Sequence, residues 1–139
     1  MKQTLKVSFP GGKKVDVTAG DFHVQTDQCV KAGGEASAPE PFDLFLSSLA
    51  SCAGIYALNF CQSRNLPTDG LSLDMDWERD DKPPFSARVH YRLTLPKDFP
   101  DKYRSSILKA VELCTVKRYL HNPPEFTLCQ VPIDHRFSF

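Results

Sequence analysis

Five cysteines are the residues of this 139-residue chain best suited to chemistry: Cys29, Cys52, Cys61, Cys114 and Cys129. Their odd number argues against a disulfide framework, and no C-x-x-C pair or Cys/His pair has the spacing of a zinc site. We therefore expect neither a metal nor a cofactor. A free cysteine often packs as a small hydrophobic residue, so a reactive thiol must be recognised from the element that carries it. Cys29, in a polar loop, and Cys129, in a predicted strand, are expected to be incidental.

The stretch LFLSSLASCAGIYALNFCQS, residues 44–63, holds two of the thiols and no charged side chain. Prolines precede it and a Pro-Thr-Asp-Gly turn follows it, which predicts one long helix from about Pro41 to about Asn65. Cys52 and Cys61 are nine residues apart, about 180° around such a helix, so they face opposite ways and cannot pair. A thiol buried in an apolar helix has a raised pKa and is inert unless a positive charge approaches it.

The same stretch is long enough to cross a bilayer, but its composition favours a helix buried on nearly every side. It contains four serines, an asparagine and a glutamine, and Asp43 and Arg64 close its two ends. A helix that is apolar all round needs cover on every side, and one chain of this size has few elements to supply it. We therefore expect a homodimer with this helix at or near the subunit interface.

Cys114 stands at the junction between a predicted helix over 101–113 and a short helix that ends near His121. A thiol at the start of a helix meets unpaired N–H groups and the positive end of the helix dipole, so we expect a lowered pKa there. Lys117 and Arg118 follow within one turn. They either reinforce this effect or form a solvated face.

Hydrophobic periodicity divides the whole chain into strands and helices. In order, we expect three strands within 1–27, a loop over 28–38, the long helix, a hairpin of strands 71–78 and 85–95, helices over 101–113 and up to 121, and a last strand region over 126–139. Asp101 is the expected N-cap of the second helix. The order βββ–α–ββ–αα–β is α+β, and neither a repeat nor a linker divides residues 1–139 into more than one domain.

Charge and composition exclude several classes of function. Lysine plus arginine and aspartate plus glutamate each number 17, so the formal charge is zero. Without a basic stripe or a basic amphipathic helix, we expect no nucleic acid and no membrane as partner. The N-terminal residues MKQTLKVSF lack the apolar core of a signal peptide, so we expect a cytoplasmic protein.

Two segments resemble a known family. The run APEPFDLFLSSLASCAG, residues 38–54, is similar to the proline-acid-leucine segment that leads into the cysteine helix of the OsmC/Ohr family, and LCTVKRYL, residues 113–120, is similar to its second cysteine motif. The order of elements agrees over nearly the whole chain. The resemblance implies an OsmC-like fold, an intertwined homodimer in which two long central helices are wrapped by antiparallel sheets.

The resemblance also implies a chemistry. In the peroxidase members of the family, the cysteine that matches Cys52 attacks an organic hydroperoxide, and the one that matches Cys114 resolves the resulting sulfenic acid to a disulfide. A dithiol reductant of lipoyl or thioredoxin type then restores the thiols. An apolar lining of Phe45, Leu49 and Tyr56 suits an alkyl or aryl hydroperoxide.

The chain departs from the family pattern at three places. Lys13 stands in the turn where the family's peroxidases have an arginine, and lysine lacks the bidentate fork of arginine. Asp43 is the acid nearest the helix, nine residues before Cys52, and is expected either to act in catalysis or only to stabilise the helix N-terminus. Thr115 replaces the family's proline. We expect Lys13 to activate Cys52, with Lys14 and then Arg118 as alternatives, or to belong to a solvated turn.

Two functions therefore stand side by side. The first is a thiol-dependent peroxidase that reduces organic hydroperoxides through Cys52 and Cys114. The second is a non-enzymatic dimer that binds a small apolar ligand at the subunit interface and uses its cysteines only for packing. Because both cysteines stand at the family positions, we favour the peroxidase.

Overall fold

The computed structural model describes residues 2–130 and confirms the α+β class and the order of elements as far as the third helix. The strands are β1 (Lys6–Gly11), β2 (Lys14–Ala19), β3 (Phe22–Thr26), β4 (Ser72–Arg79) and β5 (Ala87–Thr94), and the helices are α1 (Pro41–Gln62), α2 (Arg104–Glu112) and α3 (Thr115–His121), with 3₁₀ turns at Val30–Ala32 and Asp101–Tyr103. The predicted last strand falls mainly on 131–139, outside the described residues, and residues 126–130 have no regular secondary structure.

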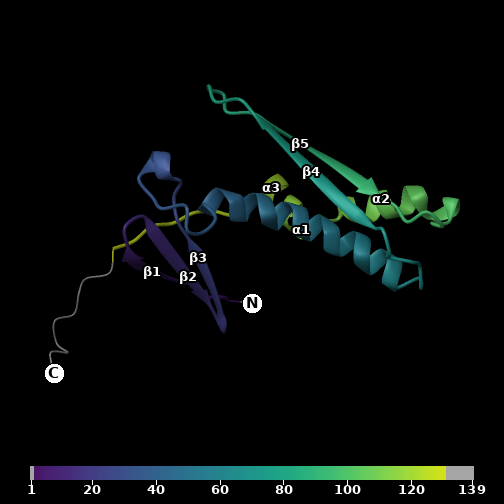
Figure 1. Ribbon diagram of the computed structural model, residues 1–139, viewed down its shortest axis with the longest axis horizontal. Helices are drawn as coiled ribbons and strands as arrows, with labels where there is room; N and C mark the ends of the chain where they lie inside the picture. Colours follow the sequence, from purple (N-terminus) through teal and green to yellow (C-terminus); the bar gives the residue numbers. More distant parts are fainter. Residues whose placement is uncertain (1, 131–139) are drawn as a thin grey trace.

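The first three strands form one antiparallel sheet in the order β1-β2-β3 (Figure 1). The segment after β3 is organised by Asp27, whose side chain is buried and accepts hydrogen bonds from the N–H groups of Gln28, Glu35 and Ser37 and from the Ser37 hydroxyl. The Ser37 hydroxyl and these N–H groups hold the pKa of Asp27 well below its usual range. The Asp27 carboxylate thus fixes the conformation of the loop that leads into α1.

Helix α1 begins and ends with recognisable caps. Pro41 occupies its first turn, and the Asp43 carboxylate accepts a hydrogen bond of 3.0 Å from the Glu40 N–H. At the other end, Asn65 adopts a left-handed conformation with φ of 51°, and the Leu66 N–H bonds back to the Cys61 carbonyl at 2.9 Å. This arrangement is a Schellman-type C-cap. The helix therefore ends at Gln62, whereas the sequence predicted an end at about Asn65.

Within one subunit, α1 is buried along a single stripe rather than on nearly every side. The buried residues of the helix are Leu49, Ala53, Ala57, Phe60 and Cys61. All of them except Leu49 join Phe99 and the α2 residues Ile107 and Val111 in one core cluster. The remaining faces are half-buried or exposed. By length and composition alone, with a mean hydropathy of 1.6, α1 also meets the test for a membrane span, which the core helix of a soluble protein can pass as well.

The second sheet is the hairpin β4–β5, which pairs Met75 with Tyr91 and Trp77 with Val89. Its apolar residues alternate with polar ones, so one face lies toward the helices. The Trp77 ring packs edge-on against Phe42 and Phe45 of α1, with ring centroids 5.6 and 6.2 Å away. The hairpin is thereby anchored to the N-terminal half of α1.

The expected N-cap of the second helix is wrong. Asp101 lies in a 3₁₀ turn that precedes α2, and its carboxylate accepts a 2.7 Å hydrogen bond from the Arg104 guanidinium. Pro100 is the residue at the N-terminal cap of that turn. The acid therefore stabilises the turn through a side-chain pair three residues on, without a direct bond to the helix N–H groups.

Candidate active site around Cys52

Cys52 lies in the middle of α1, where α3 packs against the helix (Figure 1). Its side chain is half-buried, whereas the Cys114 side chain is 0 % exposed. Cys114 stands at the N-terminal cap of α3, with a backbone φ of −44° and ψ of 122°. The fold thus brings the two thiols of the resemblance together from positions 62 residues apart in the sequence.

The start of α3 supplies hydrogen-bond donors to Cys52. The first N–H groups of a helix have no partner within the helix, and those of Thr115 and Val116 lie close enough to the Cys52 sulfur to lower the pKa of its thiol. The Cys114 thiol also donates to it. Three donors therefore converge on one sulfur atom, an arrangement that stabilises a negative charge there.

These donors determine the protonation of Cys52. Burial raises the pKa of the thiol, but the Val116 N–H, the Cys114 thiol, the Thr115 N–H and the positive charge of Arg118 outweigh burial and hold the pKa below its ordinary value. Cys52 is therefore a thiolate over a wider range of pH than a free cysteine. Thiolates are the nucleophilic form of cysteine.

The pKa of Cys114 changes in the opposite direction from the one expected. Burial raises it, and the hydrogen bond and negative charge of Cys52 add to the rise, although the Lys117 N–H acts against it. The sequence predicted a lowered pKa because Cys114 begins α3. Complete burial outweighs the helix terminus here, and Cys52 gains most from that terminus.

A chain of hydrogen bonds ties α1 to α3 beside the two thiols. The Tyr56 hydroxyl lies 2.9 Å from Thr115 Oγ1, and Thr115 Oγ1 accepts a 3.2 Å hydrogen bond from Arg118 Nη2. Tyr56 follows Cys52 by four residues, so both lie on one face of α1. These contacts hold the side chain of Arg118 at the start of α3, on the side where Cys52 lies.

Strand β5 completes the wall around the thiols. Burial raises the pKa of Tyr91, and the negative charges of Cys114 and Cys52 raise it further, so this hydroxyl stays neutral beside both sulfurs. The sequence alone did not identify Tyr91 as part of the site. Alternation along β5 assigned the residue to the inner face, but only the packing of the hairpin on the helices decides what it meets there.

The structure places Lys13 and Asp43 away from Cys52 within one subunit. The Lys13 side chain lies against Gly33: a Cβ atom added to that glycine would be 3.6 Å from the Lys13 Cε. Lys14 forms an ion pair with Glu35 at 2.6 Å. Asp43 closes the N-terminus of α1, about 13 Å along the helix axis from Cys52 at 1.5 Å per residue. Of the three cations considered, Arg118 is the one whose charge acts on Cys52 in the same chain.

The other three cysteines lie elsewhere. Cys61 is buried in the core, where burial raises its pKa. Cys29 and Cys129 are exposed, and all five thiols are free within residues 2–130. In that part of the chain, no group of three or more His, Cys, Asp or Glu side chains is arranged to hold a metal ion.

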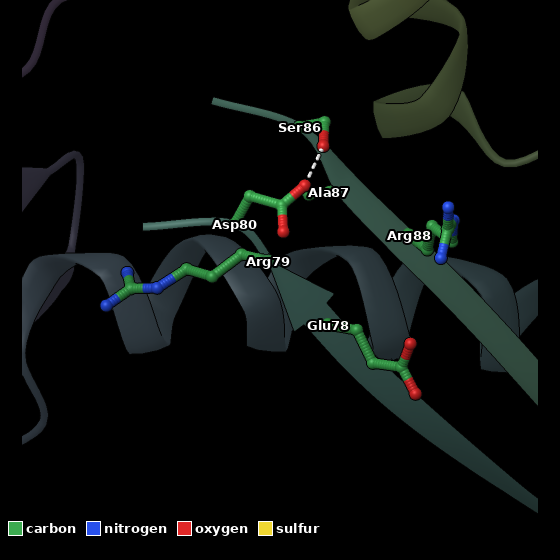
Figure 2. Close-up of a pocket in the computed structure, with 6 residues that line it drawn as sticks. All are labelled: Glu78, Arg79, Asp80, Ser86, Ala87 and Arg88. Carbon is green, nitrogen blue, oxygen red and sulfur yellow. Dashed lines mark hydrogen bonds between the residues drawn. The ribbon is translucent and has the colours of Figure 1, made fainter. Parts of the chain in front are cut away.

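Two of the hollows along the hairpin differ in the character of their lining. One, of about 460 Å³, is bordered by aromatic residues of α1 and of the hairpin, Phe42, Trp77 and Phe85. The other, of about 170 Å³, lies between the ends of β4 and β5, and Figure 2 shows its charged lining of Glu78, Arg79, Asp80 and Arg88, with Ser86 bonded to Asp80. The charged hollow contains no cysteine, whereas the aromatic hollow adjoins the helix that carries Cys52.

The family model for OsmC-like protein matches residues 34–128, which span both cysteine segments. Because the match covers more than half of the chain, the chain belongs to the OsmC-like protein family. A search of curated proteins finds no match.

Several crystal structures share the fold at low sequence identity. A proposed osmotic stress induced and detoxification response protein from Psychrobacter arcticus has a TM-score of 0.70 and 21% identity, covering 85% of this chain and 88% of its own. Organic hydroperoxide resistance proteins are similar as well. The one from Elizabethkingia anophelis has a TM-score of 0.63 at 15% identity and covers 88% and 90% of the two chains. OhrB of Bacillus subtilis has a TM-score of 0.56 at 16% identity and covers 88% and 93%.

Proposed function

We propose that the protein is a thiol-dependent peroxidase that reduces organic hydroperoxides, with Cys52 as the attacking thiol and Cys114 as the resolving thiol. One observation carries the proposal. The accessible sulfur, Cys52, has a pKa below its ordinary value, and the sulfur that donates a hydrogen bond to it, Cys114, is fully buried with a raised pKa. The pair thus consists of a nucleophile and a protonated thiol held next to it.

The chemistry proceeds in three balanced steps. The Cys52 thiolate attacks the terminal oxygen of the hydroperoxide, and the O–O bond breaks, so the sulfur becomes a sulfenic acid and the alkoxide leaves and takes a proton to form an alcohol. The Cys114 thiol then condenses with the sulfenic acid, which forms the disulfide and releases water. An external dithiol of lipoyl or thioredoxin type finally reduces the disulfide by exchange and is itself oxidised.

The surroundings of Cys52 favour an organic substrate. Leu49 and Phe45 precede Cys52 by three and seven residues on the same face of α1, and Phe45 belongs to the aromatic cluster with Phe42 and Trp77. An apolar surface gains by covering an alkyl or aryl group and gains nothing from hydrogen peroxide. The names of the Elizabethkingia anophelis and Bacillus subtilis proteins agree with this substrate class.

The test is a count of thiols in reduced protein before and after one equivalent of cumene hydroperoxide. We expect two thiols to disappear, and peptide mapping to find Cys52 linked to Cys114 with the other three cysteines reduced. With a dithiol present, Cys52→Ser should lose hydroperoxide consumption, and Cys29→Ser, at an exposed cysteine outside the site, should keep it. Cys114→Ser should accumulate a sulfenic acid that dimedone traps at Cys52.

Undiminished consumption by Cys52→Ser contradicts the assignment of Cys52, and a wild-type protein that consumes no hydroperoxide favours the non-enzymatic dimer with an apolar ligand. A disulfide between any other pair of cysteines after one equivalent of peroxide contradicts the assignment of Cys114. Each of these results leaves the fold and the family unchanged, because these rest on the sequence match and on the architecture.

A further inference from the structure

The replacement of the family's proline by Thr115 adds contacts to the site. A proline at this position would have neither an N–H nor a hydroxyl. Thr115 uses both groups: its hydroxyl contacts Tyr56 and accepts from Arg118, and its N–H helps to lower the pKa of the Cys52 thiol. The residue that departs from the family pattern is therefore the one that links the thiol, the long helix and the nearest cation.

Deepening the proposed function, we propose that Tyr56 and Thr115 are positioning residues that hold Arg118 toward the Cys52 sulfur and so make it the cation of the attacking thiolate. Tyr56 lies one turn after Cys52 on the same helix, so its bond to Thr115 sets the start of α3 against the thiol. Thr115 Oγ1 in turn orients the guanidinium at 3.2 Å. All three residues come from the same subunit as Cys52.

The exposure of Arg118 explains why it needs such support. An exposed arginine samples many rotamers, and its attraction for a nearby anion is then small and screened by salt. A hydrogen bond to a half-buried hydroxyl restricts the guanidinium to one region. Lys117, its neighbour on α3, is half-buried, and no such side-chain hydrogen bond ties it to Thr115 within the described residues.

In this arrangement, the cation that stabilises the Cys52 thiolate comes from the second cysteine segment and not from the N-terminal turn. An arginine in the N-terminal turn serves the family's peroxidases, and here that turn carries Lys13 and Lys14, which lie against the loop over 27–37. A cation four residues after Cys114 fills the same electrostatic need from α3. Within residues 2–130, the other ionisable groups whose charge is coupled to that of Cys52 are Cys114 and Tyr91, and burial raises the pKa of both.

The experiment measures alkylation of Cys52 by iodoacetamide as a function of pH, with the modified peptide quantified by mass spectrometry. At pH 7 and low salt, Arg118→Met, Thr115→Val and Tyr56→Phe should each slow the reaction by about threefold to tenfold and move its pH profile upward, since they remove or misplace the cation. Thr115→Ser, which keeps the hydroxyl, should retain most of the wild-type alkylation rate. Arg118→Lys, which keeps the charge, should retain part of it. Lys117→Met, the matched control on α3, should react like the wild type.

The double variant Thr115→Val/Arg118→Met should be no slower than Arg118→Met alone, because the hydroxyl acts through the guanidinium. In 1 M salt, the gap between the wild type and Arg118→Met should close. Wild-type alkylation profiles in both Arg118→Met and Thr115→Val overturn the proposal, and so does a Lys117→Met variant that is as slow as Arg118→Met.

The same variants separate this inference from the proposed function. If the wild type consumes cumene hydroperoxide and Arg118→Met reacts unchanged, the peroxidase stands and the positioning role is wrong. If the wild type is inert toward hydroperoxide and Arg118→Met still slows alkylation of Cys52, the positioning of the thiolate is supported and the peroxidase is wrong.

Discussion

The two site cysteines differ because their sulfur atoms compete for the same donors. The N–H of Val116 acts on both thiols, but the Thr115 N–H and the charge of Arg118 act on Cys52. Whichever sulfur holds the negative charge raises the pKa of the other, since two like charges at hydrogen-bond distance repel each other. When one of the pair ionises, the other is therefore held as a thiol, and the lowered pKa places the charge on Cys52, the less buried of the two.

At the residue scale, we predict that alkylation of Cys52 has its midpoint below that of N-acetylcysteine. The pKa of the thiol lies below its ordinary value, so at any given pH the thiolate fraction of Cys52 exceeds that of a free cysteine, and it falls as the pH drops through the lowered pKa. The measurement is the iodoacetamide rate against pH in reduced protein, read from the peptide that carries Cys52. A midpoint at or above that of the free amino acid contradicts the prediction.

At the element scale, the short helix α3 contributes through its first backbone groups. Thr115 is the first residue of that helix, a position where proline is tolerated because its N–H would have no helical partner. The ψ of Cys114, 122°, also lies in the range that a following proline favours. The N–H of Thr115 can thus be removed by substitution with proline without preventing the folding of α3.

Thr115→Pro should therefore keep the fold and slow alkylation of Cys52 further than Thr115→Val does, by about another threefold at pH 7. Valine removes only the hydroxyl, whereas proline removes the N–H bond to the sulfur as well. Far-ultraviolet circular dichroism and the thermal midpoint of both variants check that α3 is intact. Equal rates in the two variants would show that this N–H does not act on the thiolate.

At the scale of the whole molecule, a single subunit leaves too much apolar surface uncovered. Helix α1 packs on α2, α3 and β4, while the sheet β1–β3 makes its main contacts within itself (Figure 1). Phe9 and Phe22 on this sheet are 79% and 77% exposed, and Ile55 of α1 is 45% exposed. Exposed large apolar side chains on two elements are typical of an interaction surface, and a second copy of the chain is the partner that the family's architecture implies.

We predict a homodimer that does not dissociate without unfolding. Light scattering at micromolar concentration should give twice the chain mass, and the dimer should persist in denaturant until circular dichroism is lost. Ile55→Glu places a charge on the uncovered face of α1 and should weaken or abolish the dimer, since an unpaired charge is costly to bury. A folded monomer of the wild-type protein at this concentration contradicts the prediction.

The amino-acid sequence by itself determined the α+β class, the order of elements and the two cysteine segments. Period-two alternation located β4 and β5, prolines and an uncharged run located α1, and the resemblance rested on residues 38–54 and 113–120. These features are local, because propensity, capping and hydrophobic period act over a few residues. Even so, the sequence predicted α1 to be about three residues too long, because the turn after Gln62 was not recognised.

Only the tertiary structure decided which groups surround Cys52. Tyr56, Tyr91, Thr115 and Arg118 come from three elements, and their distance from the sulfur depends on how α1, α3 and β5 pack. Burial likewise reversed the expected direction of the Cys114 pKa. Protonation depends on desolvation and on charges within a few ångströms in space, and neither quantity is set by neighbours in the sequence.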